Sequence, residues 1–144
     1  LSQFGDLEIH LISSNIKKIS EYEKKIYGGV SKNFYVRDVV IGFKKKPIIF
    51  ARSITELHNS KRLIYLLKKL NNRSLGSILF SRNYNRSQFK YSKSKQIQFS
   101  TDKFRKINVE LEKLLVLRQS FFTNRKEKIL LFEGFLENAR MYDE

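Results

Sequence analysis

Four charged residues stand in rows of alternate positions that are otherwise apolar: Arg37, Arg52, Arg118 and Glu133. If those rows face a core, the charges are buried, and a buried charge is costly unless another group pairs with it. Three arginines against one glutamate leave excess positive charge, and arginine does not give up its proton. The pattern therefore predicts a site that an anion enters, and a carboxylate matches the fork of the guanidinium group.

A structural network is the other interpretation of the same four residues, with Glu133 paired to one arginine and the other guanidinium groups reaching solvent. In the interpretation as a binding site, Glu133 accepts a hydrogen bond from a hydroxyl group of the ligand. A small aromatic or cyclic acid with a hydroxyl opposite its carboxylate would use both ends of such a site. The sequence has no nucleophile triad, phosphate-binding loop, dinucleotide fingerprint or metal motif, which leaves a cofactor-free reaction or simple ligand binding.

The elements that position these residues are predicted by an alternation of period two among β-branched and aromatic residues. Residues 33–42 and 48–55 are predicted strands, and the short connection through Pro47 joins them in an antiparallel hairpin. Residues 114–123 and 128–136 form a second predicted hairpin. Each of these strands carries one of the four charged residues.

The other segments complete a mostly antiparallel sheet with one clear helix, which is an α+β domain. Residues 7–13 and 85–93 are predicted strands, and residues 60–70 form an amphipathic helix with a leucine stripe. Residues 15–30 are polar and rich in lysine, so we expect a loop there with no more than one helical turn.

No internal repeat or linker divides the chain, so residues 1–144 are predicted to be a single domain. Within it, residues 94–113 are polar and charged and are predicted to be an insertion. Leu75 and Gly76 begin a short apolar segment at residues 75–80. The glycine has two interpretations: it lets backbone amides approach another group, or it is an ordinary turn residue.

The formal net charge of +15 favours nucleic acid or another anionic partner, or else reflects an AT-rich genome, since the chain is rich in Lys, Asn, Ile, Phe and Tyr. Basic and aromatic residues alternate in residues 94–113, as on surfaces that bind single-stranded nucleic acid. A basic nucleic-acid-binding or assembly protein is therefore one alternative function. No apolar run approaches about 18 residues, so no membrane span is predicted, and the absence of cysteine excludes a disulfide framework.

Five short motifs, taken in order, resemble the chorismate pyruvate-lyase family. They are YVRDVV at residues 35–40, IFARS at 49–53, LGSILF at 75–80, LRQSF at 117–121 and ILLFEGF at 129–135. The resemblance extends over residues 7–137 and is strongest toward the branch found in cyanobacteria and as an open reading frame in red-algal plastid genomes.

This resemblance implies a six-stranded antiparallel sheet with helices packed on one side and a buried site. It also implies a carbon–oxygen lyase that removes pyruvate from chorismate and leaves 4-hydroxybenzoate, with no metal or organic cofactor. The product would serve quinone biosynthesis, here plastoquinone, in the stroma of a plastid or, alternatively, in a bacterial cytoplasm. Chorismate and 4-hydroxybenzoate would then be the small-molecule partners.

The resemblance also implies roles for individual residues. Arg37 would bind the ring carboxylate, and the backbone at Leu75, with Gly76 behind it, would add amide hydrogen bonds to the same carboxylate. Glu133 would contact the ring hydroxyl and, with Arg37, form the catalytic pair.

Two further arginines, Arg52 and Arg118, would bind carboxylate on the side where the substrate enters. We expect two departures from the family: absence of the N-terminal helix that usually precedes the first strand, and a segment at residues 94–113 that is longer than the matching loop of the compact bacterial enzymes. The same fold is the effector-sensing domain of a family of bacterial transcription regulators. A non-catalytic sensor of aromatic acids is therefore a second alternative.

Overall fold

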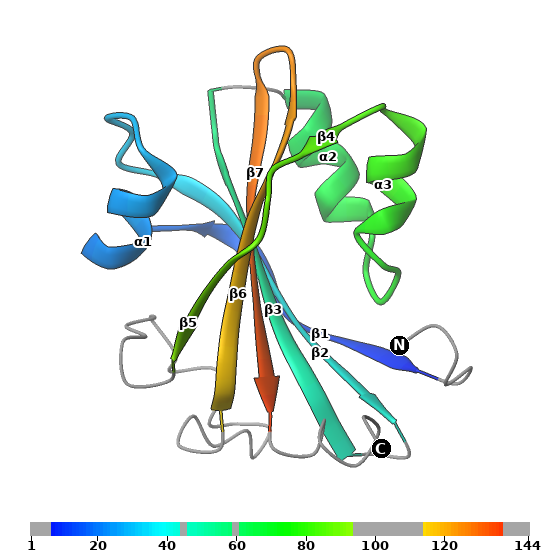
Figure 1. The fold of residues 1–144 in the computed structure, drawn as a ribbon. Helices are drawn as coiled ribbons and strands as arrows, with labels where there is room; N and C mark the ends of the chain where they lie inside the picture. The colour runs from blue at the N-terminus through cyan, green and yellow to red at the C-terminus, as the bar shows by residue number, and fades with distance from the viewer. Residues whose placement is uncertain (1–6, 44–45, 59–60, 94–113, 137–144) are drawn as a thin grey trace.

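The computed structural model describes residues 7–43, 46–58, 61–93 and 114–136, and all structural statements below concern these residues. They form one antiparallel sheet and three helices (Figure 1). The strands are β1 Glu8–Lys17, β2 Phe34–Phe43, β3 Lys46–Glu56, β4 Asn85–Arg86, β5 Lys90–Lys93, β6 Leu114–Asn124 and β7 Glu127–Leu136, and the helices are α1 Glu21–Tyr27, α2 Lys61–Lys69 and α3 Gly76–Ser81. The predicted α+β class is confirmed, whereas the predicted insertion at residues 94–113 lies outside the described residues.

The strand order is β1-β2-β3-β7-β6-β4, with β5 also paired to β6. Both short strands lie along the same edge, because Asn85 is opposite Thr123 and Lys90 is opposite Gln119 further along β6. The sheet therefore has seven strands in six positions, which agrees with the six-stranded architecture that the resemblance implies.

The helices lie on both faces of the sheet, which corrects the expectation that they pack on one side (Figure 1). The α1 face buries one apolar cluster, and the face of α2 and α3 buries another that includes Tyr35, Leu63, Leu67, Ile78 and Ile129. The sequence prediction did not include α1 as a helix of two turns. Its start is set by a capping box, in which the Ser20 hydroxyl accepts from the Glu23 amide at 3.1 Å and Glu23 accepts from the Ser20 amide at 2.8 Å.

Both predicted hairpins are present. In the first, Arg37 is opposite Ser53 and Asp38 is opposite Arg52; in the second, Arg118 is opposite Glu133. The first hairpin has an irregular register between Ile41 and Gly42, where a side-chain carbon on Gly42 would lie 2.6 Å from the Lys46 carbonyl oxygen. Glycine is therefore required at position 42 by the close approach of the two strands.

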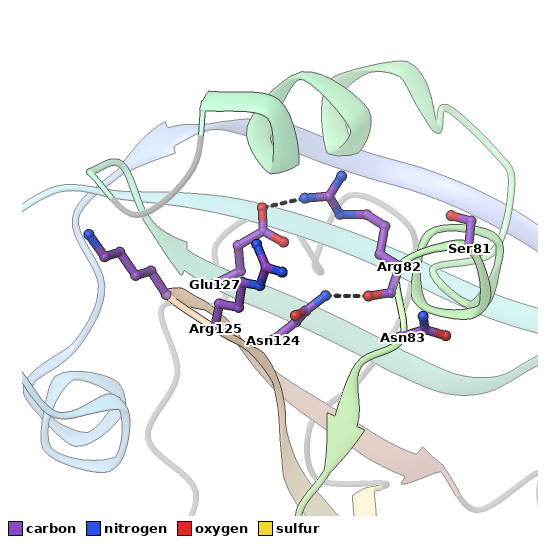
Figure 2. A pocket seen from close by; sticks show the side chains of 7 residues that line it. Ser81, Arg82, Asn83, Asn124, Arg125 and Glu127 are labelled. Atoms are coloured by element: carbon purple, nitrogen blue, oxygen red, sulfur yellow. Dashed lines mark hydrogen bonds and ion pairs between the residues drawn. The ribbon is translucent and has the colours of Figure 1, made fainter.

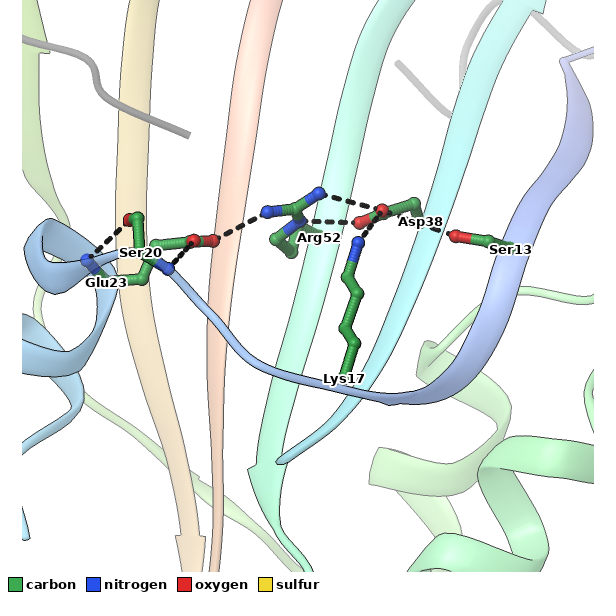
Figure 3. Close-up of polar contacts among 6 residues, drawn as sticks. All are labelled: Ser13, Lys17, Ser20, Glu23, Asp38 and Arg52. Atoms are coloured by element: carbon green, nitrogen blue, oxygen red, sulfur yellow. Dashed lines mark hydrogen bonds and ion pairs between the residues drawn. The ribbon is translucent and has the colours of Figure 1, made fainter. Parts of the chain in front are cut away.

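A buried ion network fixes α1 to the sheet, and it runs from β1 to α1 in Figure 3. The Arg52 guanidinium donates to Asp38 from Nε at 2.7 Å and from Nη2 at 2.9 Å, and to Glu23 Oε2 from Nη1 at 2.8 Å. All three side chains are at most 1% exposed. Lys17 and Ser13 on β1 add longer contacts to Asp38. Although burial opposes the charge of Arg52, the two carboxylates outweigh it and raise its pKa.

We expect Asp38→Ala to destabilise the fold by about 3–5 kcal/mol, because it leaves the buried Arg52 with Glu23 as its remaining strong partner. Urea unfolding followed by circular dichroism measures the change. Glu8→Ala is the matched control, since Glu8 pairs with His10 at a site where both side chains are more than half exposed, and its loss should stay below about 1 kcal/mol. Equal effects of the two substitutions would contradict a stabilising network at Arg52.

Candidate active site

The face of the sheet under α2 and α3 carries Arg37 in a row that crosses four strands. Arg37 on β2 is opposite Ser53 on β3, Ser53 is opposite Leu131 on β7, and Leu131 is opposite Ser120 on β6. Residues directly opposite each other in an antiparallel pair point to the same face. The row therefore places a buried guanidinium and two hydroxyl groups on one surface.

The next row along the strands carries two more charges of this face. Ala51 on β3 is opposite Glu133 on β7, which is opposite Arg118 on β6, which is opposite Tyr91 on β5. Arg37, Glu133 and Arg118 are therefore brought onto one face, as predicted from their strand positions.

Arg37 is the buried cation of this face, with the residue only 2% exposed. Its Nη2 donates to the carbonyl oxygens of Asn71 at 3.1 Å and Arg73 at 2.6 Å. Its Nε is buried and has no hydrogen-bond partner among the described residues, and none of their carboxylates forms an ion pair with it. Burial lowers the pKa of this guanidinium. Arg37 is thus anchored by main-chain carbonyls and keeps a donor for an anion.

The segment that holds Arg37 is the link from α2 to α3. Asn71 has a φ of 51°, a left-handed conformation that asparagine tolerates, and the chain reverses there after α2. Leu75 and Gly76 follow in the same link, at the start of α3, where the first amides of a helix have no intrahelical acceptor. The side chain of Arg37 and the backbone that was predicted to assist it are therefore parts of one local structure.

Both carboxylate oxygens of Glu133 accept a hydrogen bond from Arg118. Arg118 Nε donates to Oε1 at 3.0 Å and Nη2 donates to Oε2 at 3.0 Å, a fork-to-fork pair with side chains 24% and 17% exposed. Burial opposes the charge of Arg118, but Glu133, and to a smaller extent Tyr91, raise its pKa. The alternative of a structural network is therefore realised for Arg118. Arg37 donates to main-chain carbonyls and forms no ion pair among the described residues.

Arg52, which was grouped with these residues from sequence, lies on the opposite face of the sheet. Because β3 pairs Arg52 with Asp38 and not with Arg37, alternation turns it toward α1. Its charge is neutralised there by two carboxylates. The structure does not bring Arg52 together with Arg37 and Glu133.

A hollow of about 430 Å³ adjoins the Arg37 region between β1 and α2. Its lining includes Tyr35, two residues before Arg37 on the same face, and Asn71, whose carbonyl accepts from Arg37. Lys68 lies over the Tyr35 ring at 5.8 Å, and the hydroxyls of Tyr35 and Ser14 are 2.5 Å apart. Arg37 itself is not among the residues that line this hollow.

A second hollow, of about 760 Å³, surrounds the turn between β6 and β7 and lies away from the two rows (Figure 2). Polar groups in and beside this hollow bond to one another. Arg82 donates to Glu127 at 2.5 Å, and Tyr84 donates to the same carboxylate at 2.7 Å. Burial and Glu127 raise the pKa of Tyr84 to about 12. These groups join the turn to the segment after α3.

Ser120 is a candidate that sequence reasoning missed. The residue is 1% exposed, and its Oγ has no partner among the described residues. Its position two residues after Arg118, on the same face of β6, was the available signal. A buried hydroxyl without a partner is unfavourable, and a bound ligand would relieve that cost.

None of the described helices is long and apolar enough to cross a membrane. The described residues also contain no group of three or more acidic or histidine side chains with the spacing of a metal site.

Comparison with solved structures supports the fold. The effector domain of PhnF from Mycobacterium smegmatis superposes with a TM-score of 0.61 at 7% identity, over 92% of this chain and 82% of that one. The C-terminal domain of the histidine utilization repressor from Pseudomonas syringae gives a TM-score of 0.65 at 7% identity, over 93% and 94% of the two chains. At this level of identity the likeness concerns the fold alone.

Comparison of sequences defines the family. A probable chorismate pyruvate-lyase from Hydrogenovibrio crunogenus is 28% identical over 140 residues, which cover 93% of this chain and 72% of that protein. The family model for chorismate lyase matches residues 1–144. The chain therefore belongs to the chorismate lyase family, whose members act on a small molecule.

Proposed function

We propose that this protein is a chorismate pyruvate-lyase, which converts chorismate to 4-hydroxybenzoate and pyruvate. The observation that carries the proposal is Arg37: a buried guanidinium anchored by two carbonyls, with no carboxylate partner among the described residues and a free Nε. Such a cation is stabilised by an anion that enters from outside. The ring carboxylate of chorismate is an anion of the right shape for a guanidinium fork.

The spacing of Arg37 and Glu133 supports a ligand that spans the two rows. They are separated by two strand intervals of about 4.8 Å and one two-residue step of about 6.8 Å, so their α-carbons are about 12 Å apart. Both side chains point to the same face, with Ser53 and Ala51 of β3 on that face between their strands. In our proposal the ring lies between them, with the carboxylate at Arg37 and the hydroxyl donating to Glu133.

The amides of Leu75 and Gly76 add donors at the carboxylate end of the proposed site. Arg37 holds the same link through the carbonyls of Asn71 and Arg73, so one side chain would order the backbone and bind the ligand. Donors that are fixed before the substrate arrives lose little entropy when it binds.

The reaction balances without an added reagent. The ring gives up the enolpyruvyl ether by cleavage of its carbon–oxygen bond, and the ring carbon that bears the hydroxyl loses its hydrogen as a proton. The ring becomes aromatic, and the released enol becomes pyruvate. Because aromatisation supplies the driving force, orientation of the ring and of the leaving group is the main task of the protein.

The setting we propose is quinone biosynthesis, in a plastid or a bacterial cytoplasm. Its support is the resemblance of the sequence motifs to the cyanobacterial and plastid branch, together with a composition rich in Lys, Asn and Ile.

A sensor of aromatic acids is the second candidate function. The observation that favours it is the fold shared with an effector domain and with the C-terminal domain of a repressor. A sensor would use the same Arg37 and Glu133 contacts and would bind 4-hydroxybenzoate, or a similar acid, without turnover.

The test of the enzyme is incubation with chorismate while 4-hydroxybenzoate and pyruvate are measured together. We expect equal amounts of both.

Arg37→Ala should lower kcat/KM by about 100-fold or more, because it removes charge-assisted hydrogen bonds of about 1.5–3 kcal/mol each. Arg62→Ala, at an exposed position of α2, is the control and should retain activity. Circular dichroism checks that each variant is folded. Turnover at the wild-type rate in Arg37→Ala would contradict the proposed role of Arg37 in a chorismate lyase.

The test of the sensor is a thermal-shift titration with 4-hydroxybenzoate. Ligand at 100 times its Kd should stabilise the wild type by about 2.7 kcal/mol and raise Tm by several degrees. Arg37→Ala should remove the shift. A shift without any product from chorismate would favour the sensor over the enzyme, whereas product formation would exclude a purely sensing role.

A further inference from the structure

Glu133 is held in this structure as a hydrogen-bond acceptor. Both of its oxygens receive a hydrogen bond from Arg118, at 3.0 Å each, in the fork geometry that favours an ionised carboxylate. An ionised carboxylate has no proton to donate, so any further contact must come from a donor on the ligand.

Arg118 is itself fixed by its surroundings. Its guanidinium lies 4.0 Å from the centre of the Phe89 ring and 5.1 Å from that of Phe135. Tyr91 is opposite it across β5 and β6. These contacts keep the side chain extended toward Glu133, so its two donors in that pair have a constant direction.

We propose that Arg118 is a positioning residue that keeps Glu133 an oriented acceptor and so makes the site select acids with a hydrogen-bond donor opposite the carboxylate. The inference rests on the proposed placement of the ligand between Arg37 and Glu133. It assigns Arg118 a role through Glu133 and not through direct contact with a substrate carboxylate. It also defines a ligand class, in which para-hydroxy and para-amino acids are accepted and para substituents that only accept hydrogen bonds are rejected.

Among the contacts that the structure describes, the orientation of Glu133 depends on Arg118, which bonds both of its oxygens. On one side β3 presents Ala51, and beyond Arg118 on the other side β5 presents Tyr91. On its own strand the next residue of the same face is Phe135. Loss of the guanidinium would leave both carboxylate oxygens without the donors that orient them. A carboxylate without a fixed orientation would accept less well from the ligand, and selection for a donor on the ligand would then weaken.

The experiment measures Kd values by calorimetry for three benzoates of similar size: 4-hydroxybenzoate, 4-aminobenzoate and 4-fluorobenzoate. The fluorine cannot donate a hydrogen bond, so the ratio of its Kd to that of the hydroxy acid reports the donor preference. The proteins are the wild type, Arg118→Gln, Arg118→Lys and Glu133→Gln, each between pH 5.5 and 8. Arg86→Gln is the matched control, because Arg86 also lies over the Phe89 ring, at 4.3 Å, without bonding Glu133.

We expect the wild type and Arg86→Gln to bind both donor acids at least about tenfold more tightly than the fluoro acid, at every pH. Arg118→Gln should reduce this ratio below about threefold. Arg118→Lys should fall between the wild type and Arg118→Gln, since a lysine ammonium contacts a carboxylate without the fork geometry. Glu133→Gln should lose most of the ratio, because the amide presents a donor as well as an acceptor.

A ratio that stays at the wild-type value in Arg118→Gln at every pH overturns the role of Arg118 while the proposed site stands. If Arg118→Gln does not fold, a wild-type ratio in Glu133→Gln overturns the role of Arg118 together with the proposed contact between Glu133 and the ligand. Failure of the wild type to bind any of the three acids overturns the proposed site itself, and the inference with it. Because the readout is binding, the result does not depend on whether the protein turns chorismate over.

Discussion

Alternation along β2 sends two neighbouring charges, Arg37 and Asp38, to opposite faces of one sheet, and the rest of the structure follows from how each is neutralised. On the α1 face Asp38 meets Arg52, whose remaining donor reaches Glu23, so the charges there are matched within the protein. On the other face Arg37 meets only two carbonyl oxygens among the described residues. The charges of the α1 face are therefore paired within the protein. On the other face, Arg37 keeps a donor that a bound anion could accept from.

The α1 face also gives the face of Arg37 its rigidity. Glu23 caps α1 with one carboxylate oxygen and binds Arg52 on β3 with the other. Arg52 also binds Asp38 on β2, so its guanidinium joins the helix to both strands. Replacing such a network by apolar residues is often neutral, which means its value lies in geometry more than in net stability. Here the network fixes the position of β2, which lies between β1 and β3, and Arg37 is the residue next to Asp38 on that strand.

The sequence was sufficient to predict what depends on local pattern. Alternation within single strands predicts the two hairpins and shows which residues of a strand share a face. It also places Arg37, Arg118 and Glu133 in apolar rows. The face of Arg52 did not follow, because it depends on the register between β2 and β3, and a shift of one residue reverses it. The partners of Arg37 are backbone carbonyls, which leave no mark in residue types. The Ser20–Glu23 capping box was visible, but the lysine-rich composition around it favoured a loop.

The proposed site bears on the choice between an enzyme and a sensor. In that site an aromatic acid with a para hydroxyl would offer a carboxylate to Arg37 and a donor to Glu133, and the proposed product retains both groups. A site of this kind therefore binds its product through the same contacts as its substrate, and loss of the chemistry would leave binding intact. The floor of the site consists of strand residues whose positions are set by register, whereas the leaving enolpyruvyl group must be held by elements above the sheet. Divergence between sensing and catalysis can therefore arise in the covering segments while β2, β6 and β7 remain unchanged.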